Sequence, residues 1–439
     1  MPSKYAATTR TSLVSYKCGP AGYRVTKIHN MTYIQKSARD GFSNLGIAPN
    51  LLQILNRLHF TDPTPIQHQA IPAALEGKDI VGIAQTGTGK TLAFGLPMLQ
   101  RLGTQKGQGL ILLPTRELAL QVDEALRQVG SQLGLKTAVL IGGAPIRGQL
   151  RLLANKPHII IATPGRLVDH MEQKTVSLRG ISILVLDEAD RMFDIGFAPQ
   201  IKRIIATIPS ERQTMLFSAT IPAAITDMAA RHMKMPVRVE VAPSGTAAAQ
   251  IEQEIFIARP EIKLQLLEKV LSDNRGSVLI FSRTKYGAKK IAAVVRNMGH
   301  TAVEMHSNRS LSQRKAALAG FKSGFYRVLV ATDIAARGID VIGISLVINY
   351  DMPGQSEDYV HRIGRTGRAG QTGKAISFAA PNQRGDIKQI EKLIRKTLPV
   401  VDLPVLPLRR AAPTHSSGYA GASKYSRNNR PKWSHHRRR

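Results

Sequence analysis

The segment from Ala84 to Thr91 constrains the fold more than any other part of the chain. It follows an apolar run, Ile80 to Ile83, and precedes Leu92-Ala93-Phe94, so the sequence predicts a buried strand, a glycine turn and a helix in that order. Glycines in such a turn let backbone N–H groups point inward at a polyphosphate, beside the positive end of the helix. The predicted nucleotide-binding residues of this loop are Ala84, Gln85, Thr86, Gly87, Thr88, Gly89, Lys90 and Thr91.

Two side chains of the loop have specific predicted roles. Lys90 is placed to reach the β- and γ-phosphates of a nucleotide, and the Thr91 hydroxyl is placed to hold Mg²⁺. Ala84 stands where the general phosphate-loop pattern has its first glycine. A glycine-rich turn without a ligand is the plainer interpretation of the same residues.

After the loop, apolar runs at 109–113, 137–141 and 158–162 are each followed by a polar turn, and helical patterns recur between them. This alternation is typical of an α/β fold with a doubly wound parallel sheet, which binds ligands at the carboxyl ends of its strands. The turns carry Pro114, Thr115 and Arg116, then Gly142 and Gly143, then Thr163, Pro164, Gly165 and Arg166. Such residues either cap helices or donate hydrogen bonds to a nucleic-acid phosphate chain.

The next apolar run, 181–186, ends in acids at Asp187, Glu188 and Asp190. Acids delivered by a buried strand are costly unless they have a function. Beside a phosphate loop, Asp187 is expected to hold magnesium and Glu188 to polarise the attacking water. A surface turn of acids is the alternative. A further run, 213–217, leads to Ser218 and Thr220, whose hydroxyls are placed to link the acids to a neighbouring surface.

The second half of the chain repeats the strand pattern at 278–281, 301–305, 327–331 and 345–349, but it has neither a phosphate loop nor a strand-end acid pair. It is therefore not expected to hydrolyse a nucleotide alone. It does carry His361, Arg365 and Arg368, and arginines three residues apart face the same way on a helix or tight turn. We interpret them as arginine fingers supplied to the other domain, which would make hydrolysis depend on domain closure. A solvated basic face is the alternative.

Charge indicates the partner. The 439 residues include 61 Lys and Arg against 30 Asp and Glu, a net charge of +31, which favours a polyanion, with nucleic acid ahead of an anionic membrane. Cys18 is the sole cysteine, so disulfides and cysteine-based zinc sites are excluded. No apolar run approaches about 18 residues, so no membrane span is expected and a cytoplasmic protein is predicted.

These observations divide the chain into five parts. Residues 1–39 lack acids and are predicted to be a basic disordered extension, although a transit peptide or a natural start at Met31 fits equally. The first domain is predicted at 40–238, a linker at 239–250 and the second domain at 251–398. Residues 399–439 are predicted to be a disordered basic RNA-binding tail, whose rings Tyr419, Tyr425 and Trp433 suit stacking on RNA. A solubilising tail is the alternative.

Taken together, the loop at 84–91, the Asp-Glu-Ala-Asp at 187–190, Ser218-Ala219-Thr220 and the segment 361–368 resemble the DEAD-box RNA helicases of superfamily 2. The resemblance covers about Phe42 to Leu398. It implies two tandem RecA-like domains that close on ATP, Mg²⁺ and single-stranded RNA. A compact core followed by a basic tail is most similar to the bacterial RhlE-type subgroup.

The resemblance also implies roles for individual residues. Gln67, already suggestive because it lies one helix before the phosphate loop, would read adenine, with Phe42 stacked on it. Asp340 would contact the ribose, and His361 would join Asp190 and the Ser218 and Thr220 hydroxyls in coupling the domains. The implied RNA contacts are Pro114, Thr115, Arg116, Gly142, Gly143, Thr163, Pro164, Gly165 and Arg166 in the first domain and Arg283, Arg314 and Thr332 in the second.

Two positions depart from the family pattern. His59 replaces the usual glycine before Phe60, and Leu311 stands where many members have a glutamine. The expected function is that of an ATP-dependent RNA helicase that separates short duplexes or remodels RNA–protein complexes, with little sequence preference. A nucleotide-gated RNA clamp or annealing protein driven by the tail, and a DNA translocase, are the alternatives. The RNA target is left open between ribosomal precursors and RNA-decay complexes.

Overall fold

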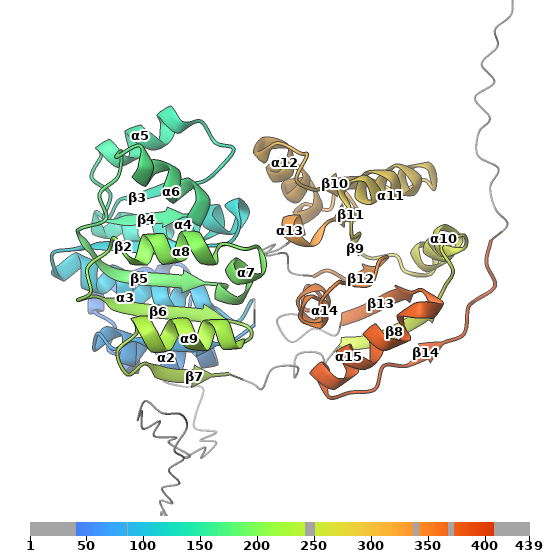
Figure 1. Cartoon of the computed structure of the whole chain (residues 1–439), viewed down its shortest axis with the longest axis horizontal. Helices are drawn as coiled ribbons and strands as arrows, with labels where there is room; N and C mark the ends of the chain where they lie inside the picture. Colours follow the sequence, from blue (N-terminus) through green and yellow to red (C-terminus); the bar gives the residue numbers. More distant parts are fainter. Residues whose placement is uncertain are drawn as a thin grey trace, which may run out of the picture.

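The computed structural model describes residues 41–85, 87–241, 251–336, 341, 343–367 and 373–407. Two α/β lobes lie side by side, the first coloured blue to green and the second yellow to red (Figure 1). Each lobe is built on a seven-stranded sheet whose paired strands all run parallel. The predicted fold class of two tandem RecA-like domains is therefore confirmed. Within the described ranges, no helix has the length and apolarity needed to cross a membrane.

The first sheet has the strand order β3-β4-β2-β5-β6-β1-β7. Its strands are β1 (Ile80–Ile83), β2 (Gln108–Leu112), β3 (Thr137–Leu140), β4 (Ile159–Ala162), β5 (Ile181–Asp187), β6 (Gln213–Ser218) and β7 (Val237–Glu240). The helices of this lobe are α1 (Pro49–Arg57), α2 (Pro65–Leu75), α3 (Lys90–Thr104), α4 (Arg116–Gly130), α5 (Ile146–Ala154), α6 (Pro164–Glu172), α7 (Ala189–Asp194), α8 (Ala198–Ile205) and α9 (Ala223–His232).

Burial on both faces explains why the central strands are apolar throughout. In β5, Ile183 and Val185 pack into the cluster built with α2, α3 and α4, whereas Leu184 and Leu186 pack into the cluster on the opposite face with α6, α8 and α9. Since side chains alternate along a strand, a sheet covered on both sides needs an apolar residue at every position. The apolar runs seen in the sequence are these strands.

The second sheet has the order β10-β11-β9-β12-β13-β8-β14. Its strands are β8 (Ile251–Ile257), β9 (Val278–Phe281), β10 (Ala302–Met305), β11 (Val328–Ala331), β12 (Leu346–Asn349), β13 (Gly373–Ala379) and β14 (Val400–Val401). Helices α10 (Lys263–Asp273) and α11 (Lys285–Asn297) share one apolar cluster with the sheet, and α12 (Leu311–Lys322), α13 (Asp333–Ala336), α14 (Ser356–Ile363) and α15 (Arg384–Ile394) share the other.

Two predicted domain boundaries need correction. The boundary at 238 falls inside β7, which pairs with β1 through Glu240. The boundary at 398 precedes β14, which pairs with β8, and Pro407 still accepts a hydrogen bond from the Gln265 side chain. Edge strands bury one face only, so they lack the apolar run that marks a central strand. Residues 1–40, 242–250 and 408–439, to which the disordered extension, the rest of the linker and most of the tail were assigned, lie outside the described ranges.

Candidate active site

The phosphate loop joins β1 to α3, as predicted. Gly87 and Gly89 have φ of 84° and 88°, a left-handed conformation that residues with a Cβ rarely adopt. Lys90 is the first residue of α3, and its buried ammonium donates to the Ala84 carbonyl at 3.1 Å. The Thr88 hydroxyl closes the loop by donating to the Gln85 carbonyl at 2.7 Å. Thr86 lies outside the described residues. The described part of the loop therefore holds the lysine ammonium through the backbone carbonyl of Ala84.

Gln67 braces this loop from α2. Its Oε1 accepts from the Thr64 backbone N–H at 2.9 Å, and its Nε2 donates to the Gly89 carbonyl at 3.0 Å. A Cβ added at Gly89 would lie 2.5 Å from that Nε2, so the side chain packs directly on the glycine. Phe42, expected to stack on adenine, is buried in the core of the first lobe. Adenine recognition by Gln67 and Phe42 stays a prediction, whereas the contact between Gln67 and the loop is observed.

The acids stand at the carboxyl end of β5, facing the loop. Asp187 is buried, accepts from the Glu188 N–H at 3.0 Å, and lies 3.9 Å from the Lys90 ammonium. Burial raises the pKa of Asp187 from 3.8 to about 6; the Lys90 charge opposes the rise, and the Glu188 charge adds to it. Glu188 is buried with φ of 51°, a strained conformation for a non-glycine residue and one common at functional sites.

Asp187 and Thr91 suit a magnesium ion. Asp187 accepts one hydrogen bond among the described residues, which leaves carboxylate lone pairs for a metal. Thr91, the next residue after Lys90, provides a hydroxyl in the first turn of α3. The described residues contain no cluster of three or more acidic, histidine or cysteine ligands. Such a sparse set is what Mg²⁺ uses when nucleotide phosphates and water complete its shell.

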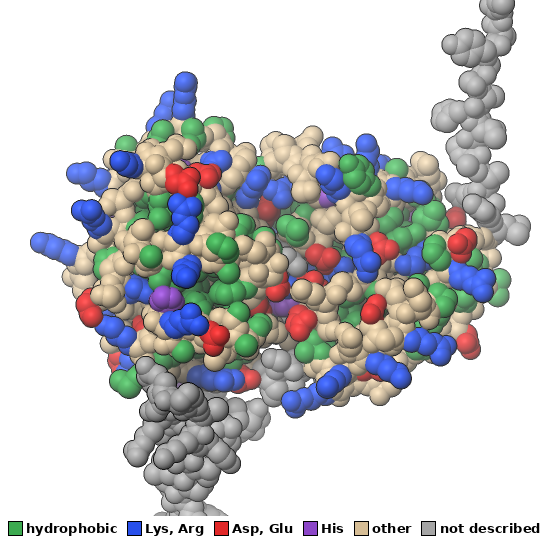
Figure 2. Space-filling model, viewed as in Figure 1, with side chains coloured by type: hydrophobic (Ala, Val, Ile, Leu, Met, Phe, Trp, Pro, Cys, Tyr) green, Lys and Arg blue, Asp and Glu red, His purple; other side chains and the backbone are tan. Residues whose placement is uncertain are grey.

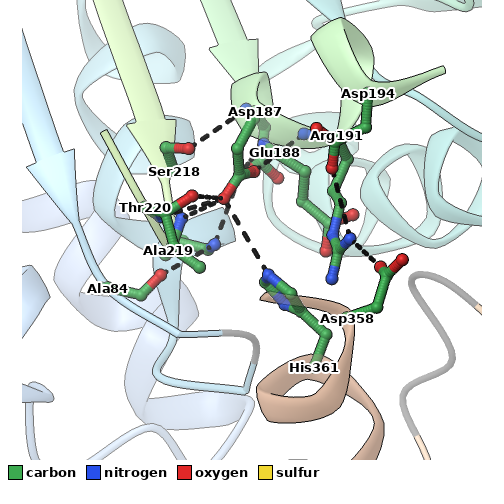
Figure 3. Close-up of polar contacts among 12 residues, drawn as sticks. Ala84, Asp187, Glu188, Arg191, Asp194, Ser218, Ala219, Thr220, Asp358 and His361 are labelled. Atoms are coloured by element: carbon green, nitrogen blue, oxygen red, sulfur yellow. Dashed lines mark hydrogen bonds and ion pairs between the residues drawn. The ribbon is translucent and has the colours of Figure 1, made fainter. Parts of the chain in front are cut away.

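Asp190 joins the two lobes. Its backbone N–H donates to the Ser218 hydroxyl at 3.1 Å, and its Oδ2 accepts from the Thr220 N–H and hydroxyl, both at 2.9 Å. The same Oδ2 lies 4.0 Å from Nε2 of His361 on α14 of the second lobe (Figure 3). The structure therefore brings together all four residues that were predicted to couple the domains.

The end of α14 approaches the phosphate loop. Arg365 is buried two residues beyond the helix, and a Cβ at Gly364 would lie 3.9 Å from the Gln85 amide oxygen. Arg362 points into its own domain instead, where it pairs with the Asp333 carboxylate at 2.5 Å and 2.7 Å. Arg368 and Asp340 lie outside the described residues. An arginine from the second lobe thus sits at the junction, as the finger interpretation requires.

The first-lobe turns predicted to contact RNA converge on Arg116. Gly143 has a φ of 71°, which favours glycine, and a Cβ there would lie 2.1 Å from the Arg116 guanidinium, so the arginine packs directly on this turn. Arg166 donates to the Ala144 carbonyl at 3.1 Å from the neighbouring turn. Burial lowers the pKa of Arg116, and the charges of Arg314 and Arg166 act in the same direction. Cations from two turns and from the second lobe therefore share one site. Lys and Arg side chains also stand over the visible face of both lobes (Figure 2).

The second-lobe candidates are arranged differently. Arg314 lies 2.9 Å from Glu117 of the first lobe, and both side chains are buried. Leu311, one turn before it, packs against the first-lobe core, at the edge of a cavity of about 820 Å³ between α4, α5 and α12. Arg283 is exposed, and Thr332 is partly exposed. Arg314 thus makes an interdomain ion pair in this structure, and its contact with RNA stays a prediction.

Sequence reasoning missed Arg191 and Asp358, and it placed Glu117 in a turn expected to contact RNA and not in an interdomain ion pair. Arg191 follows Asp190 directly, is buried, and donates to Asp358 of α14. The one available signal was a cation immediately after the acid cluster. His59, the departure before Phe60, is exposed with φ of 60°. It thus adopts the left-handed conformation that the usual glycine favours, at a cost of about 1 kcal/mol.

The fold and this site define a class: two tandem RecA-like domains with a phosphate loop and strand-end acids on one and an arginine from the other. The DEAD/DEAH box helicase family matches residues 64–228, and the helicase conserved C-terminal domain matches 262–370. The chain is 43% identical to an ATP-dependent rRNA helicase RRP3 of Candida albicans, covering 83% of this chain and 69% of that protein. It is 41% identical to a DEAD-box ATP-dependent RNA helicase CshA of Bacillus cereus, covering 83% and 70%.

Among solved structures, Saccharomyces cerevisiae Dbp5 bound to RNA and ADP BeF3 superposes with a TM-score of 0.74 at 31% identity. The match covers 83% of this chain and 96% of that one. The chain therefore belongs to the DEAD-box ATP-dependent RNA helicase family. The finer RhlE-type assignment stays a prediction.

Proposed function

We propose that this protein hydrolyses ATP when RNA and nucleotide together close its two lobes, and that closure locally separates short RNA duplexes or remodels RNA–protein complexes. The observation that carries the proposal is the junction itself. Lys90 and Asp187 lie in one lobe, whereas His361 and Arg365 come from the other. A reaction that needs both sets of residues depends on the relative position of the lobes.

Each residue near the phosphates has a role that its position supports. Lys90 would bind the β- and γ-phosphates, Asp187 and Thr91 would hold Mg²⁺, and Glu188 would orient and polarise the attacking water. When bound, Mg²⁺ would neutralise charge on the phosphate oxygens. Arg365 and Arg368 would stabilise the negative charge that develops on the transferred phosphoryl group. Hydrolysis would then weaken closure and release the RNA.

The RNA is proposed to run along the carboxyl edges of both sheets. In the first lobe the proposed contacts are the turns with Thr115, Arg116, Gly143 and Arg166, and in the second lobe Arg283 and Thr332. Such contacts address the phosphate backbone, so affinity should depend on salt and little on sequence. Dbp5 is bound to RNA, and RRP3 is described as an rRNA helicase. Ribosomal RNA is therefore the first substrate to test, and a cytoplasmic location is part of the proposal.

The test is ATP turnover by the full chain with single-stranded RNA, single-stranded DNA and no nucleic acid. RNA should raise turnover at least about tenfold, and Glu188→Gln should lower it by about 100- to 10,000-fold while ATP-dependent RNA binding persists. Glu211→Gln, an exposed glutamate in the same lobe, is the matched control and should behave like the wild type. Equal stimulation by DNA would favour a translocase. Undiminished turnover by Glu188→Gln would remove the role assigned to that residue.

A truncation distinguishes the enzyme from a tail-driven RNA clamp. Because β14 and the segment up to Pro407 belong to the second domain, the cut belongs after residue 407 and not after 398. Removal of 408–439 should weaken RNA affinity but preserve ATP-driven duplex separation. Loss of every RNA response in that variant would favour the clamp.

A further inference from the structure

Helices α7 and α14 meet through two polar pairs, an arginine–aspartate ion pair and a histidine–aspartate contact. On α7, the consecutive residues Asp190 and Arg191 have opposite charges, and on α14, Asp358 and His361 lie one turn apart. Asp190 Oδ2 lies 4.0 Å from His361 Nε2, and the Arg191 Nη1 donates to the Asp358 carboxylate. Figure 3 shows His361 and Asp358 side by side on the second lobe, with Arg191 of the first lobe next to Asp358. On α7 the acid Asp190 precedes the base Arg191. On α14 their partners are the base His361 and the acid Asp358, respectively.

This polarity selects one register of α14 on α7. A slide of one helical turn would bring Asp358 toward Asp190 and away from Arg191, so the displaced arrangement sets two carboxylates together. Alternating charges exclude wrong registers in other helix pairs for the same reason. The pair with His361 alone, at 4.0 Å, would resist such a slide much less.

Because Arg191 is buried, its ion pair with Asp358 depends strongly on the correct position of α14. The Arg191 side chain is only 2% exposed although it lies at a boundary between two lobes, and the Asp358 side chain is 12% exposed. Arg191 Nη1 also lies 3.4 Å from Asp194 Oδ2 on its own helix. Arg191 therefore keeps an acid of its own lobe when the lobes separate, and gains Asp358 only when they meet. A buried cation tolerates misplacement of its acid poorly.

The register of α14 decides where Arg365 lies. Asp358, His361 and Arg365 follow one another at intervals of three and four residues, and all three line one crevice together with Arg191. Gly364 directly approaches Gln85 of the phosphate loop. A rotation or slide of α14 would therefore move Arg365 relative to the loop.

We propose that Arg191 and Asp358 form a positioning pair, which sets the register of α14 on α7 and so aims Arg365 at the nucleotide phosphates. The inference rests on the proposed function, since it concerns the rate of hydrolysis. Neither residue belongs to the set assigned to nucleotide or RNA, so their loss should leave substrate binding intact. It should lower the rate of the closed complex instead.

The experiment compares Asp358→Asn, Arg191→Gln and the double variant in the full chain, at saturating RNA and ATP. We expect each single variant to lower kcat at least tenfold with KM for ATP within twofold, and the double variant to be no slower than the worse single variant. Glu357→Gln, an exposed acid one residue away on α14, is the matched control and should keep the wild-type kcat. The charge swap Arg191→Asp with Asp358→Arg should recover part of the lost rate.

Several outcomes would overturn the pairing. If the fold-losses in kcat of the two single variants multiply in the double variant, the two residues act independently and the pairing is contradicted. A kcat for Asp358→Asn within twofold of the wild type would also contradict it. A loss fully restored by more RNA or ATP would show that the pair merely strengthens closure. Thermal melting of each variant shows whether a loss of kcat comes from unfolding. If a single variant fails to fold, the charge-swap variant takes its place in the comparison. A wild-type chain without RNA-stimulated turnover would instead defeat the proposed function and leave the geometry of the pair in place.

Discussion

The two lobes place the same residue types at equivalent points of one topology and use them differently. Each strand of the second sheet occupies the position of the first-sheet strand numbered seven lower. Lys90 opens the helix after β1, and Lys263 opens the helix after β8; Asp187 ends β5, and Asp351 follows β12. The lysine ammonium lies 3.9 Å from Asp187 in the first lobe and 3.6 Å from Asp351 in the second. The second lobe thus contains a counterpart of the lysine and acid that are proposed to be catalytic in the first.

The difference lies in what else surrounds each acid. Asp351 accepts from the Arg283 N–H at 3.0 Å and the Ser282 hydroxyl at 3.2 Å, and Lys263 donates to the Tyr350 carbonyl at 2.8 Å. Asp187 accepts one hydrogen bond among the described residues. The acid of the second lobe is satisfied by its own domain, whereas that of the first retains capacity for a ligand. Topology supplies the pair, and local donors decide whether it is structural or catalytic.

The loops explain the same contrast. Between β1 and α3, two left-handed glycines curl the backbone around Lys90. Between β8 and α10, the residues 258–262 include a proline and no glycine. A backbone with ordinary φ values cannot turn successive N–H groups onto one phosphate, so Lys263 folds back onto Tyr350 instead.

The sharpest test of this comparison replaces each acid with asparagine. Asp187→Asn should lower RNA-stimulated ATP turnover at least about 100-fold, because it removes the metal ligand and its charge. Asp351→Asn should keep turnover within about twofold, because that acid is satisfied inside its own domain. Steady-state phosphate release at saturating RNA measures both. A comparable loss in the two variants would erase the distinction between the sites.

Proton competition gives a second, smaller effect. Burial raises the pKa of Asp187 to about 6, so below that pH the carboxyl is protonated and Mg²⁺ must displace the proton. Affinity for Mg²⁺ with ATP should fall about fivefold from pH 6 to pH 5, and it should be nearly level above pH 7. Titration with a fluorescent ATP analogue at several pH values checks this. Constant affinity from pH 7 to pH 5 would mean that the pKa of Asp187 lies outside that pH range.

The raised pKa of Asp187 affects fold stability in the opposite direction: as the pH rises, Mg²⁺ binding strengthens but the fold loses stability. Because the folded-state pKa of Asp187 exceeds the usual 3.8, the folded protein binds the proton more tightly, and its contribution to the free energy of unfolding is lost as pH rises from about 4 to 6. At pH 8, Asp187→Asn should therefore be as stable as the wild type or more so. Asp351→Asn should lower the local free energy of opening by about 1–2 kcal/mol, because its charged hydrogen bonds are lost. Hydrogen exchange of β5, β9 and β12 in the full chain distinguishes the two, and destabilisation at β5 by Asp187→Asn would contradict the argument.

Much of the first site was predictable because it is local. The strand, the loop and the helix from Ile80 to Phe94 lie together in sequence, and the acids follow one apolar run. The edge strands were not predictable by that reasoning. The same holds for β8, which lies next to the edge strand β14. There Glu252 and Glu254 alternate with apolar residues, and their charges pair with Lys374 of β13 at 3.1 Å and 2.7 Å. Cross-strand pairing of that kind exists only after the sheet forms.

The contacts between lobes were still less accessible. Arg191 and Asp358 are separated by 167 positions, and their pairing depends on how the two sheets dock against each other. Arg314 was assigned to RNA on family resemblance, yet Glu117 lies 2.9 Å from it. A sequence indicates which side chains are charged, but the partner of a charge at a domain boundary depends on the docked geometry.

Backbone strain provides the smallest and final test of the comparison. Glu188 has φ of 51°, and among the described residues of the second lobe the only non-glycine residue with positive φ is Arg395, far along the chain from Asp351. If the left-handed backbone at Glu188 is strained, Glu188→Gly should relieve that strain and raise the free energy of unfolding. Glu188→Gln removes the charge but keeps a side chain on the left-handed backbone. The glycine variant should therefore be more stable than the glutamine variant by about 1 kcal/mol. Denaturant unfolding of the three proteins at one pH measures the difference. Equal stability of the glycine and glutamine variants would show that burial of the charge, and not the backbone, makes this strand end costly, and the two lobes would then differ in electrostatics alone.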